Sequence, residues 1–225
     1  MAVNIERYKE IVAELLKQNI TLVAVSKTKP NQDISDLYNS GQRDFGENYV
    51  QELVDKHAAL PSDIRWHFIG HLQTNKVKYI APFVHLIHGV DSFKLLKEIN
   101  KRAAGCGRVI DCLLQVHIAQ EETKFGLDEK ELNLIIKQFD NLKLGNIRIC
   151  GLMGMASFTE NMDVVRSEFR SLKTIFNKQA PLTTHYSPLT TLSMGMSSDY
   201  KIAIEEGSNM VRIGSLIFGE RAKAE

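Results

Sequence analysis

The chain has 225 residues, of which 44% are hydrophobic and 24% are charged, and its formal net charge is +1. This is the composition of an ordinary globular domain, and it excludes an intrinsically disordered chain. A net charge so close to zero gives no electrostatic reason to expect binding to nucleic acid or to an anionic membrane.

Strand-like and helix-like segments alternate along the chain, after one amphipathic helix in which Ile5, Tyr8, Ile11 and Leu15 share a face. The first candidate strand, residues 21–27, has no charged residue before Lys27, as is typical of a strand buried on both faces. Seven more candidate strands follow, at residues 44–48, 65–70, 85–91, 108–118, 147–155, 190–197 and 209–214. Helical patterns separate them, at residues 31–41, 49–58, 74–81, 92–104, 128–139, 160–178 and 199–206.

Two of these helices carry recognisable end signals. Asn31 is a candidate N-cap for the helix at residues 31–41, and Gly41 is a natural stop at its other end. Asp128 and Glu131 have the spacing of a capping box at the start of the helix at residues 128–139.

Continuous alternation of strands and helices predicts a parallel sheet. Eight such units within residues 1–225 predict one (β/α)8 TIM barrel domain with an extra N-terminal helix. An open, doubly wound sheet remains an alternative, because element boundaries cannot be read accurately from one sequence.

Polar residues and glycines recur where the candidate strands end, as in Lys27, Glu47 and Asn48. The same holds for residues 67–71, 153–157, 193–198 and 212–215. In a barrel all these strand ends meet at one rim, where the binding sites of this fold lie. The sequence therefore predicts a ligand site there, to which Lys27 and Asn48 contribute.

Lys27 is the strongest candidate for covalent chemistry. An amine that emerges from a buried apolar strand loses hydration, which favours the neutral, nucleophilic form. A neutral amine is what a Schiff base with an aldehyde requires. The alternative is that Lys27 merely begins a turn into solvent.

Gly214 and Ser215 form a candidate phosphate cradle, at a glycine turn between the last strand and a short helix. Ser193 and Gly195, on the neighbouring strand, could close the other side of that pocket. Arg212 points the same way as Gly214, because side chains alternate along a strand, and could reach a ring attached to the phosphate. The alternative for Arg212 is an ion pair with a barrel acid such as Glu47.

Histidines and cysteines give little support to a metal site. His67 and His71 lie near a strand end, and His85 and His88 lie on one strand, so neither pair is expected to converge on an ion. The three cysteines form no CxxC pair, which argues against a zinc cluster and a disulfide framework and favours a reducing compartment. Since no signal peptide or membrane-length apolar run is evident, we expect a cytoplasmic protein.

Five longer segments are more specific than any single residue. They are VAVSKTKP, FGENYVQE, WHFIGHLQTNK, GLMGMAS and LSMGMSSDYKIAIEEGSNMVRIGSLIFGER. Together they resemble the YggS/PROSC family of pyridoxal 5′-phosphate (PLP)-binding proteins, also called PLP homeostasis proteins, over nearly the whole chain.

The resemblance implies a barrel related to the N-terminal domain of alanine racemase, with PLP held as a Schiff base on Lys27. It implies that Arg212 faces the pyridine nitrogen. It also implies that Ser193, Gly195, Gly214 and Ser215 hold the phosphate.

An arginine at the pyridine nitrogen weakens the ring as an electron sink, and we expect no second domain that would supply another acid or base. The prediction is therefore a monomeric PLP carrier in PLP homeostasis, with PLP-dependent apoenzymes as recipients and no strong catalytic activity of its own. One alternative is a PLP-dependent racemase or lyase of low activity. Another is an aldolase-like barrel that uses Lys27 on a sugar phosphate without PLP.

Overall fold

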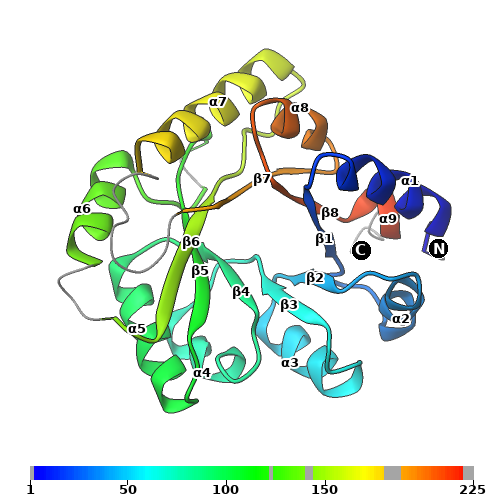
Figure 1. Ribbon diagram of the computed structural model, residues 1–225, viewed down its shortest axis with the longest axis horizontal. Helices are drawn as coiled ribbons and strands as arrows, with labels where there is room; N and C mark the ends of the chain where they lie inside the picture. Colours follow the sequence, from blue (N-terminus) through cyan, green and yellow to red (C-terminus); the bar gives the residue numbers. More distant parts are fainter. Residues whose placement is uncertain (1–2, 122–123, 140–143, 180–188, 220–225) are drawn as a thin grey trace.

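The computed structural model describes residues 3–121, 124–139, 144–179 and 189–219. Within them, eight parallel strands close into a barrel in chain order, with helices around the outside (Figure 1). The strands are β1 (Thr21–Val25), β2 (Asp44–Glu47), β3 (Arg65–Phe68), β4 (Leu86–Val90), β5 (Ile110–Gln115), β6 (Ile147–Met153), β7 (Thr191–Met196) and β8 (Met210–Ile213). The predicted barrel is confirmed, and the open sheet is excluded because β1 pairs with β8.

The predicted helices are present, each within a few residues of its expected bounds. They are α1 (Ile5–Leu16), α2 (Asn31–Asn39), α3 (Val50–Ala59), the 3-10 turn η1 (Thr74–Lys76) leading into α4 (Val77–Ile80), α5 (Phe93–Gly105), α6 (Glu129–Phe139), α7 (Met162–Gln179), α8 (Tyr200–Glu205) and the short α9 (Ser215–Phe218). Among the described residues, no helix is both long and apolar enough to span a membrane.

The helix-end predictions have mixed outcomes. The capping box is confirmed, since Asp128 Oδ1 accepts from Glu131 N at 2.8 Å and Glu131 Oε2 accepts from Asp128 N at 3.0 Å. Gly41 follows the end of α2 with φ 103°, as a glycine stop should. The N-cap prediction for Asn31 is wrong: Asn31 is the first residue of α2, and Pro30 precedes it. Proline has a fixed φ suited to this boundary, so the helix starts there without a side-chain cap.

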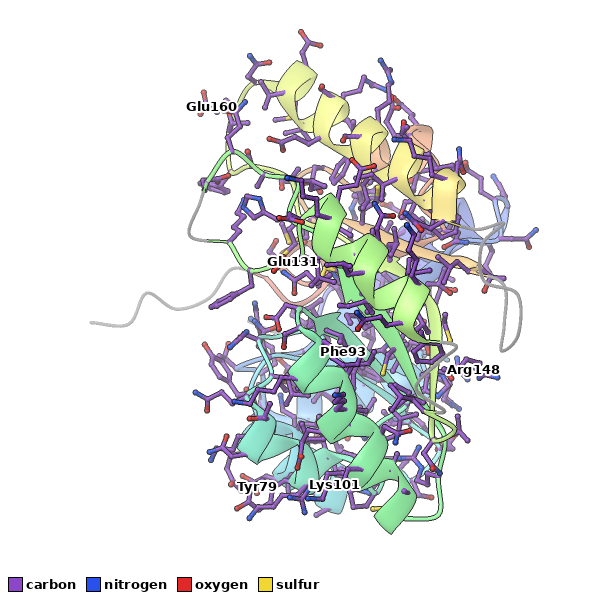
Figure 2. All side chains as sticks on the ribbon, turned by 90° about the vertical axis from the view of Figure 1, so that its left-hand side faces the viewer. Tyr79, Phe93, Lys101, Glu131, Arg148 and Glu160 are labelled. Atoms are coloured by element: carbon purple, nitrogen blue, oxygen red, sulfur yellow. The ribbon has the colours of Figure 1, made fainter. Side chains whose placement is uncertain are left out.

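Seen from the side, the barrel has two well-separated ends (Figure 2). Arg148, near the start of β6, lies at one end, and Glu160, in the loop after β6, lies at the other. We call the end at Arg148, where the strands begin, the N-terminal mouth, and the end at Glu160, where the strands end, the C-terminal mouth. α1 extends along the outside and lies beside α9, where Asn4 N donates to the carbonyl of Ile217 at 2.8 Å.

A buried ionic network holds the loop after β1. Lys56 of α3, 5% exposed, donates from Nζ to Glu47 Oε1 at 2.8 Å, to the Ser26 carbonyl at 2.8 Å and to Glu52 Oε1 at 2.7 Å. Ser26 Oγ donates to Glu47 Oε1 at 2.6 Å, and Thr28 N donates to Glu52 Oε1 at 2.6 Å. The network therefore fixes the backbone on both sides of residue 27.

Adding a methyl group at Gly151 tests the contact between β6 and β7. A Cβ there would overlap the carbonyl oxygen of Thr191, which belongs to the β7 backbone and cannot move aside cheaply. We expect Gly151→Ala to lower the free energy of unfolding by about 1–3 kcal/mol or more in urea denaturation. The control is Gly105→Ala, where a Cβ meets nothing within 4 Å. Equal stability of the two variants would contradict the barrel contact.

Replacing Lys56 with methionine tests the ionic network. The change leaves Glu47, which is 0% exposed, buried without its cation, so we expect a loss of roughly 3–5 kcal/mol at neutral pH. Burial already raises the pKa of Glu47, and losing Lys56 raises it further. A folded-state pKa above the unfolded value means that the folded protein binds the proton more tightly. The variant should therefore regain stability as the pH falls from neutral toward about 4.3.

Urea denaturation at several pH values measures this effect. Lys94→Met, which removes an exposed lysine from α5, is the control and should leave the pH dependence unchanged. If the Lys56→Met protein keeps the wild-type pH dependence of unfolding, the pKa of Glu47 does not depend on Lys56.

Candidate functional site

A cavity of about 560 Å³ opens at the C-terminal mouth. Five residues predicted from the sequence line it together: Lys27, Asn48, Arg212, Gly214 and Ser215. The other described residues on its wall are Val25, Lys29, Ile69, Met155, Phe158, Met196, Ser197, Ser198 and Gly219. The loops after β1, β2, β3, β6, β7 and β8 all contribute, as expected for a barrel site.

Lys27 lies on the loop after β1, because the strand ends at Val25 rather than at residue 27 as expected. The next residue, Thr28, has φ 63°, in a region that β-branched residues rarely adopt. Backbone strain of this kind persists only where the surroundings impose it, and it is concentrated at functional sites. Here the hydrogen bond from Thr28 N to Glu52 helps to impose it. The strained turn directs partly buried Lys27 to the cavity wall.

Lys29, the second lysine on the wall, has a structural role that sequence reasoning missed. Its Nζ donates to the carbonyls of Phe218 at 2.8 Å and Gly219 at 3.2 Å. Lysine near a helix C-terminus commonly satisfies the last carbonyl groups in this way. Lys29 thus joins the β1 loop to the end of α9.

Arg212 of β8 is 4% exposed and reaches the cavity from the barrel interior. Its Nη1 donates to Ser193 Oγ at 2.6 Å and its Nη2 to the Gly154 carbonyl at 3.0 Å. Burial lowers the pKa of Arg212 to about 10, and the nearby charge of Asp199 offsets this only in part. The alternative of an ion pair with Glu47 is wrong, because Glu47 faces α3 and pairs with Lys56.

Gly214 brings the backbone of the last turn close to β1. A Cβ at this position would lie 3.1 Å from the carbonyl oxygen of Val25, tighter than ordinary contact. Gly214 N donates to Ser197 Oγ at 3.2 Å, so this turn is also tied to the loop after β7. Asn48 faces the same cavity, and its buried Oδ1 has no hydrogen-bond partner among the described residues. An unsatisfied buried acceptor indicates a place for a donor on a ligand or water.

Ser193 and Gly195 are not among the residues that line this cavity, so their place in the phosphate cradle stays a prediction. Ser193 is 0% exposed and lies beneath Arg212, bonded to it and to His88. Gly195 has φ 95°, and a Cβ there would collide with Ala203 of α8. The strand register shifts between Ser193 and Met196, and the residues that follow the strand, Ser197 and Ser198, line the cavity. A shift in register leaves no signal in the sequence.

The charge on this wall suits an anion. Its titratable side chains, among the described residues, are Lys27, Lys29 and Arg212, all cationic in their ordinary state. Three serine hydroxyls, those of Ser197, Ser198 and Ser215, add neutral donors. The set combines two amines, one buried guanidinium and a hydroxyl-rich turn, which include the groups needed to hold a phosphorylated aldehyde.

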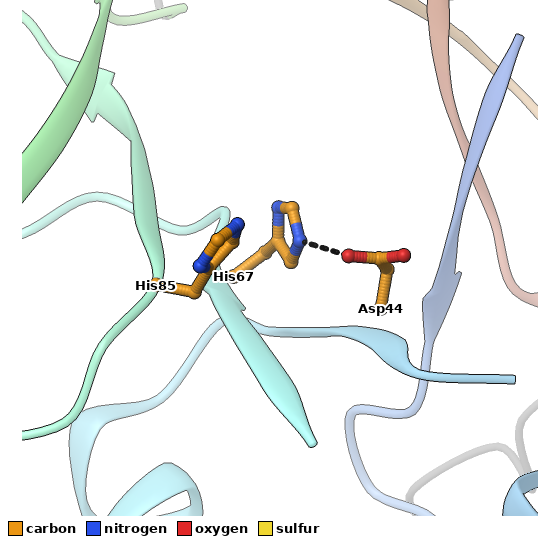
Figure 3. Close-up of side chains that lie close together, drawn as sticks. All are labelled: Asp44, His67 and His85. Carbon is orange, nitrogen blue, oxygen red and sulfur yellow. Dashed lines mark hydrogen bonds and ion pairs between the residues drawn. The ribbon is translucent and has the colours of Figure 1, made fainter. Parts of the chain in front are cut away.

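At the N-terminal mouth, a separate cavity of about 450 Å³ contains a cluster of histidines with Asp44. Nitrogen or oxygen atoms of Asp44, His67 and His85 all lie within 4.8 Å of one another (Figure 3). Neither pair considered in the sequence, His67 with His71 or His85 with His88, forms this cluster. It takes one histidine from each pair, because β3 and β4 are neighbours. The absence of a bound metal stays a prediction.

Asp44 already has strong partners. Its two carboxylate oxygens accept from Arg65 Nε at 2.7 Å and Nη2 at 2.5 Å, and Oδ1 also pairs with His67 Nε2 at 3.0 Å. Burial acts to raise the pKa of Asp44, but the hydrogen bonds from Arg65 and His67 outweigh it and hold that pKa well below its usual range. A metal ion at this position would compete with Arg65 and His67 for the carboxylate.

The comparisons with known proteins agree with this geometry. Residues 2–222 match the family described as alanine racemase, N-terminal domain. A pyridoxal phosphate homeostasis protein of Aquifex aeolicus is 45% identical over 202 residues, covering 89% of this chain and 86% of its own length. The human protein of the same name is 39% identical over 210 residues, covering 89% of this chain and 76% of its own length.

Solved structures show the same relationship. PipY of Synechococcus elongatus, with PLP bound, has a TM-score of 0.85 at 34% identity, covering 96% of this chain and 99% of PipY. Alanine racemase of Streptomyces coelicolor, at 14% identity and a TM-score of 0.74, covers 98% of this chain and 60% of its own, and it shares the fold. The chain therefore belongs to the YggS/PROSC family of pyridoxal phosphate homeostasis proteins.

Proposed function

We propose that this chain binds PLP in the cavity at the C-terminal mouth, as a Schiff base on Lys27, and acts in PLP homeostasis by holding and releasing it. One observation carries the proposal: Lys27, Arg212, Asn48 and the turn of Gly214 and Ser215 line a single cavity. Relatives named for PLP homeostasis, and a neighbouring structure with PLP bound, support the choice of ligand.

PLP, when bound, supplies an aldehyde that an amine can attack and a pyridine ring that withdraws electrons. Lys27 provides the amine. Arg212 can only donate hydrogen bonds, so it holds the pyridine nitrogen as an acceptor. The hydroxyls of Ser197, Ser198 and Ser215, with the backbone N–H groups of the last turn, hold the phosphate.

The surroundings of Lys27 favour a protein that holds PLP over an enzyme that uses PLP for catalysis. A donor such as Arg212 disfavours protonation of the ring nitrogen, which weakens the electron sink. The described residues on the cavity wall include no carboxylate, imidazole or phenol that could exchange a substrate proton. We propose that the protein works as a monomer in the cytoplasm and that PLP-dependent apoenzymes receive the cofactor from it.

The first test of the site compares Lys27→Ala with Lys29→Ala. We expect the wild-type protein and Lys29→Ala to develop a yellow absorption band with PLP, because Lys29 serves the end of α9. Lys27→Ala should lose the band, since no other amine replaces the attacking group. After borohydride reduction, peptide mass mapping should find the adduct on Lys27 alone.

Two outcomes would contradict the site. A band and an adduct that survive in Lys27→Ala would assign the amine elsewhere. Absence of any band or adduct at saturating PLP would reject PLP binding. If borohydride then traps Lys27 only after a sugar phosphate is added, the aldolase-like alternative is favoured.

A second test separates a carrier from an enzyme. Mixing the PLP-loaded protein with a PLP-dependent apoenzyme should restore that enzyme's activity, at a rate set by release of PLP. The loaded protein alone should racemise or cleave amino acids far more slowly than the ~1 s⁻¹ at which ordinary enzymes begin. Turnover at or above that rate, lost in Lys27→Ala and retained in Lys29→Ala, would instead establish a racemase or lyase.

A further inference from the structure

We propose that a chain of four hydrogen bonds through the barrel interior couples Asp44, at the N-terminal mouth, to Arg212 in the cavity at the opposite mouth. Asp44, His67 and His88 would then be positioning residues for the ligand that Arg212 holds. The coupling rests on the proposed PLP site, because Arg212 is its point of contact with the cofactor.

The four bonds run in series across five strands. Asp44 Oδ1 of β2 lies 3.0 Å from His67 Nε2 of β3, and His67 Nδ1 lies 2.9 Å from His88 Nε2 of β4. His88 Nδ1 lies 3.2 Å from Ser193 Oγ of β7, which accepts from Arg212 Nη1 of β8 at 2.6 Å. The exposed fractions of His67, His88, Ser193 and Arg212 are 1%, 0%, 0% and 4%. Water therefore has little access to any link beyond Asp44.

The two ends of this hydrogen-bond chain differ in what they can do, and the direction that we propose for the chain follows from them. A guanidinium has only donors and a carboxylate has only acceptors. Ser193 Oγ accepts from Arg212, and we assign the hydroxyl proton of Ser193 to the bond with His88 Nδ1. A neutral His88 then carries its proton on Nε2 and donates to His67 Nδ1. His67 in turn donates from Nε2 to Asp44, so every bond points toward the carboxylate.

The state of His88 fits this assignment. Burial lowers the pKa of His88 well below its ordinary value, and the charge of Arg212 acts in the same direction. A neutral imidazole has one donor and one acceptor, which is what the middle of a one-way chain needs. With both imidazoles neutral, each buried group along the path has a partner. A fully satisfied polar network specifies one arrangement, whereas a partly satisfied one is costly.

Asp44 matters because it is the acceptor at the end. Without it, His67 Nε2–H has no carboxylate to bond. His67 can then carry its proton on Nδ1 instead of Nε2, and His88 can change its tautomer in the same way. Ser193 Oγ would then accept from His88 as well as from Arg212, which weakens its hold on the guanidinium. A change at one mouth is thus transmitted to the other by switching the positions of protons, with no movement of the strands.

The N-terminal mouth also contains a matched control. Asp111 of β5 accepts from Arg148 Nε at 2.7 Å and Nη2 at 2.6 Å, the same two-point contact that Asp44 makes with Arg65. Both carboxylates line the same cavity. The difference is His67, whose Nε2 pairs with Asp44 (Figure 3), whereas no hydrogen bond among the described residues joins His67 to Asp111. Replacing Asp111 therefore removes an equal charge and an equivalent ion pair but leaves the hydrogen bonds between Asp44 and Arg212 intact.

The first experiment measures histidine tautomers by 15N NMR on the ligand-free protein. We expect His67 and His88 to be neutral and to carry their protons on Nε2. Asp44→Asn should perturb both signals, and Asp111→Asn should leave them at their wild-type positions. A proton on Nδ1 of His88, or a cationic His88, in the wild-type protein would overturn the chain without reference to PLP.

The second experiment measures PLP binding and the absorption maximum of the PLP-bound protein. We expect Asp44→Ala and Asp44→Asn to weaken PLP binding about fivefold or more and to shift the absorption maximum. Asp111→Ala and Asp111→Asn should leave the affinity within about twofold. The asparagine variants preserve the side-chain shape if the alanine variants fail to fold.

The outcomes distinguish the coupling from the site. Wild-type tautomers as expected, with PLP binding equally affected or equally unaffected by the Asp44 and Asp111 variants, would overturn the coupling alone. A wild-type protein that binds no PLP would overturn the proposed function and the coupling with it.

Discussion

Pairing of β1 with β8 is the contact on which the candidate site depends. The two strands lie in parallel register, with Val23 opposite Arg212 and Ala24 opposite Ile213. The loop that carries Lys27 and the turn at Gly214 are therefore continuations of adjacent strands, although they come from opposite ends of the sequence. The Lys29 bond to the end of α9 and the close approach of Gly214 to Val25 reinforce this contact.

The barrel interior contains an apolar cluster and a polar hydrogen-bonded path, and each has a physical reason. Val23, Leu86, Leu113, Met153 and Met210 form a separate buried apolar cluster, as barrel interiors usually do. The polar path from Asp44 to Arg212 shares the interior with it. Buried polar groups are tolerated only when paired, so the path survives because each member satisfies the next. It also lets Arg212 remain buried with neutral partners at its guanidinium.

The loop with Lys27 is held by different means. Ser26 and the strained Thr28, on either side of Lys27, are hydrogen-bonded to a buried network. This network, formed by Glu47, Glu52 and Lys56, lies on the outer face of the barrel beside α3. The amine and the arginine of the same cavity are thus supported by separate polar networks, one outside the strands and one inside. Such separate support permits the strained turn to persist next to an open cavity.

The sequence by itself determined the barrel, the order of its elements and the position of Lys27, Asn48, Arg212, Gly214 and Ser215 at one mouth. These follow from local patterns: apolar periodicity, glycine turns and polar residues at strand ends, which parallel pairing must collect on one rim. Only the tertiary structure decided that Ser193 lies beneath Arg212 and that Ser197 and Ser198 line the cavity. A register shift in β7 after Ser193 likewise turns Gly195 toward α8. Convergence of Asp44, His67 and His88 was likewise hidden, since pairing between neighbouring strands, rather than spacing along the chain, brings them together.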